Sequence, residues 1–216
     1  IPMSVVGKHF PLSNRTIAMS IVTAVGSFGY FVSPIFTNLS LNNNGWEVTL
    51  LWFLLFLIMG LIISFFVRSP SSDQILEKPN DQNTSQALNE AFKNKSYIFL
   101  VLGFFVCGFH ITLVGTHVPT YVIDRGLESW TAAAILSLIG LFNIVGSLLF
   151  GYLGDNGSKK NLLAILYTLR GVLFLLFIII PINELTVLLF ASLLGILWLS
   201  TVPLTSGIIS VMFGPY

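Results

Sequence analysis

The sequence is poor in charged residues. Only 9% of its 216 residues are Asp, Glu, Lys or Arg, whereas 55% are hydrophobic and the mean hydropathy is +0.88. A soluble domain of this size carries roughly 25% charged residues, so this chain has too few polar groups to cover its surface in water. A lipid bilayer is the environment that suits such a surface. We therefore predict an integral, multi-pass membrane protein.

Cysteine and clustered positive charge are also scarce. The single cysteine, Cys107, excludes a disulfide within the chain and a zinc site built on cysteines, and we expect it to be a small buried side chain. The ten Lys and Arg are scattered and the net charge is +1, which leaves no basic patch for nucleic acid. Since no nucleotide-binding loop is present either, we expect no metal, no cofactor and no ATP-driven activity.

Long apolar segments make up most of the chain. A membrane-spanning helix needs about 20 largely apolar residues, and a segment in lipid must satisfy its backbone hydrogen bonds internally, which favours helices. Six segments meet this requirement: Thr16–Asn38, Val48–Val67, Ser96–Tyr121, Thr131–Gly154, Asn161–Pro181 and Leu185–Phe213. The residues before Phe10 look like the end of a further helix, and both ends of the chain read as cuts, so we expect a fragment of a longer protein.

The positive charges of the loops gather on one side of the membrane. When alternate loops are assigned to opposite sides, one side receives Lys8, Arg15, Arg68, Lys78, Lys93, Lys95, Lys159 and Lys160, and the other receives only Arg125. The positive-inside rule then makes the first side cytoplasmic. The polar segment Arg68–Lys95 reads as a cytoplasmic linker with a short amphipathic helix near Ala87–Phe92. It divides the chain into residues 1–67, 68–95 and 96–216.

The sharpest motif is the loop Gly151-Tyr-Leu-Gly-Asp-Asn-Gly-Ser-Lys-Lys160. Gly151 and Gly154 allow close helix approach, and Asp155 can cap the helix that follows. Lys159 and Lys160 keep the loop on the cytoplasmic side. A plain turn is the other interpretation of such a Gly- and Asp-rich segment.

This loop resembles the signature loop of the major facilitator superfamily, with Asn156 in place of a basic residue and Ser158 in place of a glycine. The family has a weaker copy of the loop between helices eight and nine, which makes the six spans helices five to ten. The resemblance implies a partial helical bundle with about six of an expected twelve spans. Residues 1–67 would end the N-terminal bundle, and residues 96–216 would be the first four helices of the C-terminal bundle.

Further segments look like bacterial transporters related to monocarboxylate permeases and oxalate/formate antiporters. They are Cys107–His110, Thr116–Tyr121, Gly140–Ser147, Tyr167–Arg170 and Trp198–Gly207. Animal monocarboxylate permeases carry an Asp and an Arg where this chain has Asn143 and Ser147, so their substrate is not carried over. The resemblance also implies that helices seven and ten line a central cavity and that the location is a bacterial inner membrane.

Arg170 lies near the middle of its span, where an arginine costs roughly 2.5–3.5 kcal/mol to insert. No Asp or Glu lies within the six spans. Arg170 is therefore either an anion site, for example for a substrate carboxylate, or a structural residue bonded to backbone carbonyls or to helices beyond this chain.

Other intramembrane polar residues complete the candidate site. His110, His117 and Tyr121 fall near one face of an ideal helix, and the two histidines either relay protons or pack through hydrogen bonds. Trp198 and Thr201 belong to a polar last span in which Pro203 invites a kink. These two residues and Asn143 either bind substrate or join helices. The substrate-binding candidates are thus Arg170, His110, His117, Tyr121, Asn143, Trp198 and Thr201, and Gly151, Gly154, Asp155, Lys159 and Lys160 form a candidate conformational-switch loop.

The favoured function is secondary transport of a small organic solute by alternating access. We expect a carboxylate anion as substrate, protons as the coupling ion, the lipid bilayer as surroundings and a monomeric protein without enzymatic activity. Two alternatives remain. One is a non-transporting membrane sensor or assembly subunit of transporter ancestry, and the other is a membrane-embedded transferase.

Overall fold

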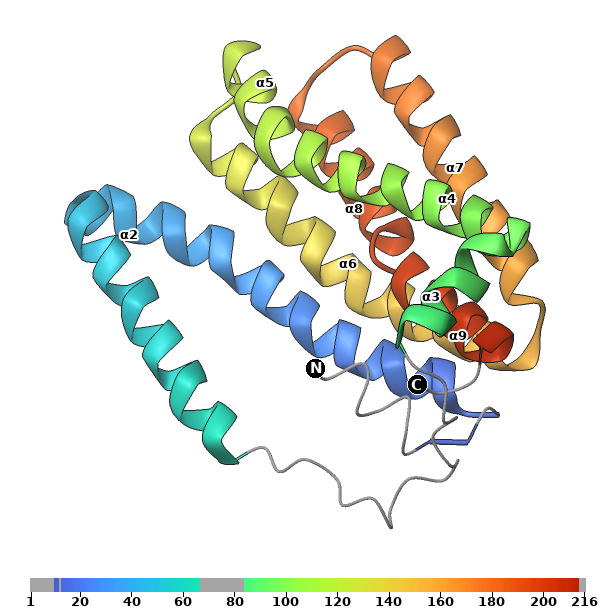
Figure 1. Ribbon diagram of the computed structural model, residues 1–216. Helices are drawn as coiled ribbons and strands as arrows, with labels where there is room; N and C mark the ends of the chain where they lie inside the picture. Colours follow the sequence, from blue (N-terminus) through green and yellow to red (C-terminus); the bar gives the residue numbers. More distant parts are fainter. Residues whose placement is uncertain (1–9, 12, 67–83, 214–216) are drawn as a thin grey trace.

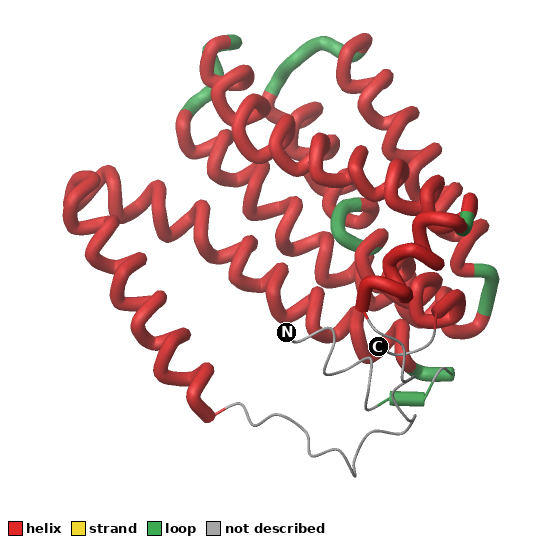
Figure 2. Tube along the Cα trace, in the orientation of Figure 1, coloured by secondary structure: helices red, strands yellow, loops and turns green. Residues whose placement is uncertain are grey.

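The chain folds into a bundle of helices. The computed structural model describes residues 10–11, 13–66 and 84–213, and within these ranges it contains helices, turns and no strand (Figures 1 and 2). Among the described residues, five helical stretches are long and apolar enough to cross a membrane: Arg15–Phe66, Lys95–Asp124, Ser129–Asn156, Lys159–Ile179 and Glu184–Phe213. The predicted all-α, multi-pass membrane protein is therefore confirmed.

The first stretch, α2 (Arg15–Phe66), folds back on itself at Gly45 (Figure 1). Its 52 residues would span about 78 Å as a straight helix, far more than the roughly 30 Å of a bilayer core. Gly45 has a φ of 76°, a left-handed conformation that glycine adopts without steric cost. The two limbs, 15–44 and 46–66, correspond to the first two predicted spans.

The turn between the limbs corrects two predicted boundaries, since the first span was expected to end at Asn38 and the second to begin at Val48. The helix instead continues up to the turn because polar side chains there bond locally. The Thr49 hydroxyl donates to the Gly45 carbonyl at 2.8 Å and also lies 2.8 Å from the Ser40 hydroxyl. Next to the turn, Phe36 of the first limb packs edge-on against Trp52, Phe53 and Phe56 of the second.

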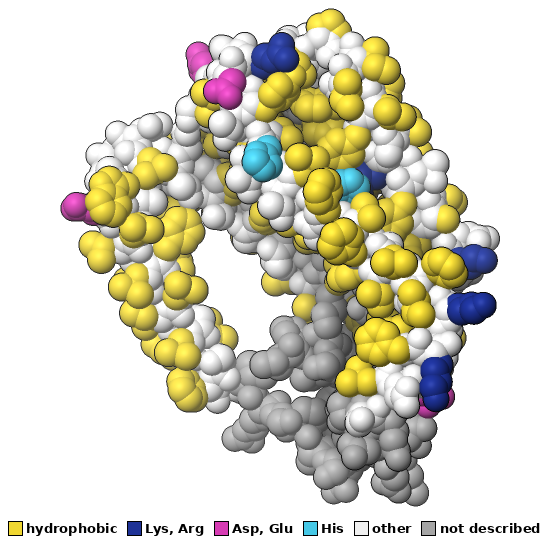
Figure 3. Space-filling view, turned by 45° about the horizontal axis from the view of Figure 1, so that its top comes forward, with side chains coloured by type: hydrophobic (Ala, Val, Ile, Leu, Met, Phe, Trp, Pro, Cys, Tyr) yellow, Lys and Arg dark blue, Asp and Glu magenta, His cyan; other side chains and the backbone are white. Residues whose placement is uncertain are grey.

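The two limbs of α2 have different surroundings. The first limb packs along α6 (Ser129–Asn156) and touches α9 (Thr201–Phe213). The second limb is exposed along most of its length, with Phe65 81% exposed. Figure 3 shows its yellow apolar side chains on a limb that stands apart from the rest of the bundle. In a membrane, such a surface is covered by lipid or by other helices.

The second predicted half of the chain forms a tighter group around α6. The 95–124 stretch comprises α4 (Lys95–Thr112), a π-helical turn η2 (Leu113–His117) and α5 (Val118–Asp124). α7 (Lys159–Ile179) and α8 (Glu184–Leu197) complete the group. Its apolar core contains fully buried side chains from α6, α7 and α8, among them Ile135, Leu166 and Leu194.

A short helix, α3 (Thr84–Lys93), precedes α4 and covers the place where the sequence predicted an amphipathic helix. The rest of the predicted linker, residues 68–83, lies outside the described residues, as do Lys8 and Val67. The division of the chain at 68–95 stays a prediction.

Candidate functional site

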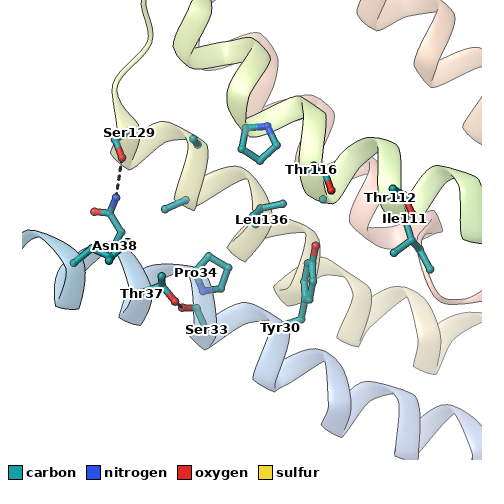
Figure 4. A pocket seen from close by; sticks show the side chains of 15 residues that line it. Tyr30, Ser33, Pro34, Thr37, Asn38, Ile111, Thr112, Thr116, Ser129 and Leu136 are labelled. Atoms are coloured by element: carbon teal, nitrogen blue, oxygen red, sulfur yellow. Dashed lines mark hydrogen bonds between the residues drawn. The ribbon is translucent and has the colours of Figure 1, made fainter. Parts of the chain in front are cut away.

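A cavity of about 660 Å³ lies between α2, the α4–α5 stretch and α6 (Figure 4). Its polar groups are hydroxyls and one amide, and none of its lining residues is charged. The lining residues are Tyr30, Ser33, Pro34, Thr37, Asn38 and Leu41 from α2, Ile111, Thr112, Gly115, Thr116 and Pro119 from α4–α5, and Ser129, Ala132, Ala133 and Leu136 from α6. The cavity suits a small polar or amphipathic molecule.

The local structure around the cavity explains its shape. Pro34 lacks an N–H and removes a backbone hydrogen bond within α2. On the opposite wall the π-helical turn contains Gly115, and a Cβ on this residue would lie 3.8 Å from the Tyr30 hydroxyl. Turns of this kind are frequent at functional sites. Where α2 meets the start of α6, the Asn38 amide donates to the Ser129 hydroxyl at 3.0 Å (Figure 4).

The opposite ends of α2 and α6 are closed against each other. The Asp155 carboxylate accepts the backbone N–H groups of Thr16 at 3.1 Å and Ile17 at 2.9 Å. It thereby satisfies two N–H groups at the beginning of α2 and faces the positive end of that helix. The Lys159 ammonium lies 3.9 Å from this carboxylate and donates to the Gly154 carbonyl at 2.8 Å.

This arrangement changes the predicted role of Asp155. Asp155 was predicted to cap the helix that follows, but the Ser158 side chain takes that place at the start of α7, and Asp155 binds α2 instead. Lys160 is exposed. The expected close approach at the glycines is present, because a Cβ on Gly151 would collide with Ser20. A Cβ on Gly154 would lie 2.6 Å from Leu204.

A second polar cluster surrounds a break in the last span, between Leu197 at the end of α8 and Thr201 at the start of α9. Arg170 is 0% exposed, and its Nη2 donates to the carbonyls of Leu197 and Trp198, the latter at 2.6 Å. Its guanidinium also lies 5.4 Å from the Tyr167 ring centre. Arg170 was expected to be either an anion site or a structural residue, and the bonds to backbone carbonyls expected of a structural residue are present. Nε and Nη1 of Arg170 have no hydrogen-bond partner among the described residues.

Three more candidates border the same break. Trp198 is buried and supplies one of the carbonyls, while the Thr201 hydroxyl lies 3.6 Å from the Cys107 thiol. Asn143 is 1% exposed; its Oδ1 accepts the Leu199 N–H at 2.8 Å and its Nδ2 donates to the Ser27 hydroxyl on α2 at 2.6 Å. The structure therefore brings Arg170, Asn143, Trp198 and Thr201 together around the break, away from the cavity lining.

The sequence of the whole chain, residues 1–216, matches the family model described as Major Facilitator Superfamily. The chain belongs to the major facilitator superfamily. It is 26% identical over 207 residues to "Uncharacterized MFS-type transporter YcxA" of Bacillus subtilis, an alignment that covers 92% of this chain and 50% of the relative. No solved structure matches significantly.

Two other relatives of this chain carry more specific names. "Agnestins efflux protein AgnL12" of Paecilomyces divaricatus is 26% identical over 172 residues, 79% of this chain and 38% of the relative. "Monocarboxylate transporter 13" of Bos taurus is 28% identical over 169 residues, 76% of this chain and 38% of the relative. The chain thus spans about half the length, or less, of the curated relatives it matches.

Three predicted substrate-binding residues remain, and none of them lines the cavity: His110, His117 and Tyr121. The His110 ring stacks on Phe174 of α7 at 5.0 Å, and Tyr121 packs edge-on against Phe177 at 6.3 Å. His117 is exposed. The shared face predicted for them assumed an uninterrupted α-helix, whereas the π-helical turn between His110 and His117 widens the local repeat.

Sequence reasoning missed the polar residues that line the cavity, although a pattern could have revealed those of α2. Tyr30, Ser33, Pro34, Thr37, Asn38 and Leu41 follow one another at intervals of one or three residues. This spacing places them on one face of a helix. A stripe of hydroxyls and an amide in a predicted span indicates a surface that avoids lipid.

Proposed function

We propose that the complete protein is a secondary transporter that moves a small organic solute across the membrane by alternating access. The observation that carries this proposal is the cavity of about 660 Å³ between α2 and the α4–α6 group. Its walls come from both sides of the predicted linker, and transporters built from two helix groups bind solutes at such an interface. Membership of the major facilitator superfamily supports the same conclusion.

The conformation corresponds to one state of such a cycle. Ser33 in the cavity wall lies 17 residues beyond Thr16, or about 25 Å along α2. The cavity therefore occupies one end of the α2–α6 contact. The other end is closed by the bonds of the Asp155 carboxylate to the Thr16 and Ile17 N–H groups. With the predicted orientation, in which the Lys159 side is cytoplasmic, this is an outward-open state.

The cavity lining favours a solute that binds through hydrogen bonds. The hydroxyls of Tyr30, Ser33 and Thr116 can donate and accept, and the Thr37 hydroxyl, which donates to the Ser33 carbonyl at 2.7 Å, can accept. The apolar residues between them can cover a hydrocarbon body. The predicted carboxylate class depends on Arg170, which does not line the cavity in this state. The proposal is therefore a polar organic solute, and carboxylates form one arm of the test.

The test is an uptake screen with the full-length protein in liposomes, using carboxylates, their uncharged amide or alcohol counterparts, amino acids and sugars. For a solute that is taken up, Tyr30→Phe removes one hydroxyl from the cavity and should raise KM by about 2- to 10-fold, the value of one neutral hydrogen bond. Tyr152→Phe is the matched control because Tyr152 is 62% exposed and lies outside the cavity. Absence of uptake for every solute by well-folded protein, or equal effects of the two substitutions, would contradict the proposal.

A further inference from the structure

The break in the last span leaves three backbone groups without their usual helical partners. In an unbroken α-helix the carbonyls of Leu197 and Trp198 would accept the N–H groups of residues 201 and 202, and the Leu199 N–H would donate to Gly195. Here the Trp198 N–H donates to Gly195 at 3.1 Å, and the Val202 N–H donates to Leu199 at 3.0 Å. Such groups are costly inside a membrane unless other partners satisfy them.

Arg170 and Asn143 supply the short side-chain bonds to these three groups, and the Thr201 hydroxyl adds a longer one of 3.5 Å to the Trp198 carbonyl. Arg170 donates to both carbonyls, and Asn143 accepts the Leu199 N–H at 2.8 Å. The cause of the break is Pro203, whose missing N–H and bulky ring disturb the turn before it. Pro203 of the last span thus disturbs the helix, and the backbone groups freed at the break are bonded mainly by Arg170 of α7 and Asn143 of α6.

The Asn143 amide has a second partner on a different helix. Its Nδ2 donates to the Ser27 hydroxyl at 2.6 Å, and Ser27 in turn donates to the Thr23 carbonyl at 2.7 Å. This chain of bonds fixes the direction of the amide, since only Oδ1 can accept the Leu199 N–H and only Nδ2 can donate to Ser27. One buried side chain thus joins α2 to the break.

The helices pack closely on either side of Asn143. A Cβ on Gly140 would lie 2.8 Å from the Cα of Phe31 on α2, and a Cβ on Gly146 would lie 2.6 Å from the carbonyl carbon of Ile196 on α8. The α6 helix is in direct backbone contact with both neighbours within one turn of Asn143. A displacement of α2 cannot be absorbed by loose packing there.

We propose that Asn143 is a positioning residue that couples the α2–α6 contact to the break between α8 and α9. The inference rests on the proposed alternating-access function, in which the two helix groups rock against each other. When α2 separates from α6, the Ser27 bond is lost and the amide turns to another acceptor. The Leu199 N–H then loses its partner, and the break rearranges. By thermodynamic linkage, a change at the break alters the α2–α6 contact by the same free energy.

The experiment measures hydrogen exchange in the full-length protein over the segment 196–204, and no substrate is required. Ser27→Ala removes the bond to α2 while leaving Asn143 in place. It should speed exchange at the break by about 5-fold or more, the lower end of typical coupling between sites. The matched control is Ser147→Ala, since Ser147 is equally buried but bonds only within its own helix, to Ile144 at 3.2 Å.

A double-mutant cycle completes the test. Asn143→Leu should also speed exchange at the break, and adding Ser27→Ala to Asn143→Leu should have no further effect because the two act through one bond. Unchanged exchange at the break in Ser27→Ala overturns the proposal, as does full additivity of the two substitutions. Since exchange is measured without transport, coupling can be confirmed even where the uptake screen fails, and the two proposals are separable.

Discussion

The contact between Asp155 and the start of α2 leads to a quantitative prediction for Asp155→Asn. The carboxylate uses both oxygens, one for the Thr16 N–H and one for the Ile17 N–H. An asparagine of the same shape keeps one uncharged oxygen and turns an NH₂ group toward the other N–H. One charge-assisted hydrogen bond is lost and the other becomes neutral, and bonds of the charged kind contribute about 1.5–3 kcal/mol each.

The expected loss is about 2–3 kcal/mol of the free energy that keeps this end closed, since the Asp155 side chain is only 6% exposed and little screened. A difference of 1.4 kcal/mol is tenfold in an equilibrium constant. Asp155→Asn should therefore shift the closed-to-open equilibrium at this end by about 30- to 140-fold. The same change should reduce the outward-open population that exposes the cavity.

Electron–electron distance measurements between spin labels at Asn14 and Tyr152, both exposed positions near this end, would report the two populations in the full-length protein. Glu184→Gln is the matched control, because Glu184 is an acidic residue in the first turn of a different helix, α8. The reasoning is refuted by an unchanged distance distribution in Asp155→Asn, or by an equal change in Glu184→Gln.

Two further predictions concern the polar residues around the break. Arg170→Gln removes the charged donor from the Leu197 and Trp198 carbonyls and should destabilise the protein by about 3 kcal/mol or more. Thermal unfolding in detergent would show this as a lowered Tm, with a smaller loss in Arg170→Lys. Normal stability with abolished uptake would instead assign Arg170 to the substrate. His110, stacked on Phe174, is the candidate for proton coupling. His110→Gln should preserve solute exchange but remove accumulation driven by a pH gradient, and unchanged accumulation would exclude this role.

The features that follow from local sequence were predictable. Runs of about 20 apolar residues located the spans, and the small residues Gly151 and Gly154 marked a place where helices touch. Arg170 stood out because a charge inside the membrane needs a partner, and bonding to backbone carbonyls was one of its two interpretations. Pro203 indicated a kink in the last span, although the break itself lies at residues 198–200.

The features that depend on tertiary contacts were not predictable from one sequence. Asp155 and Thr16 are 139 residues apart, and nothing local indicates that this carboxylate serves α2 instead of α7. The two bonds of Asn143 join segments 116 and 56 residues away. The π-helical turn at Leu113–His117 has no sequence signal of its own, so the face shared by the two histidines was assigned on an ideal helix that the chain does not form.

The fold-back at Gly45 has a consequence for biosynthesis. Both limbs of α2 are helical up to the turn, so each satisfies its own backbone without a contact to another helix. The tip between them carries Asn42, Asn43 and Asn44, followed by a single acidic residue, Glu47, and no Lys or Arg. In the predicted orientation, insertion of this hairpin carries amides and one carboxylate across the bilayer and no positive charge. A lysine introduced at Asn43 should therefore hinder insertion of both limbs together.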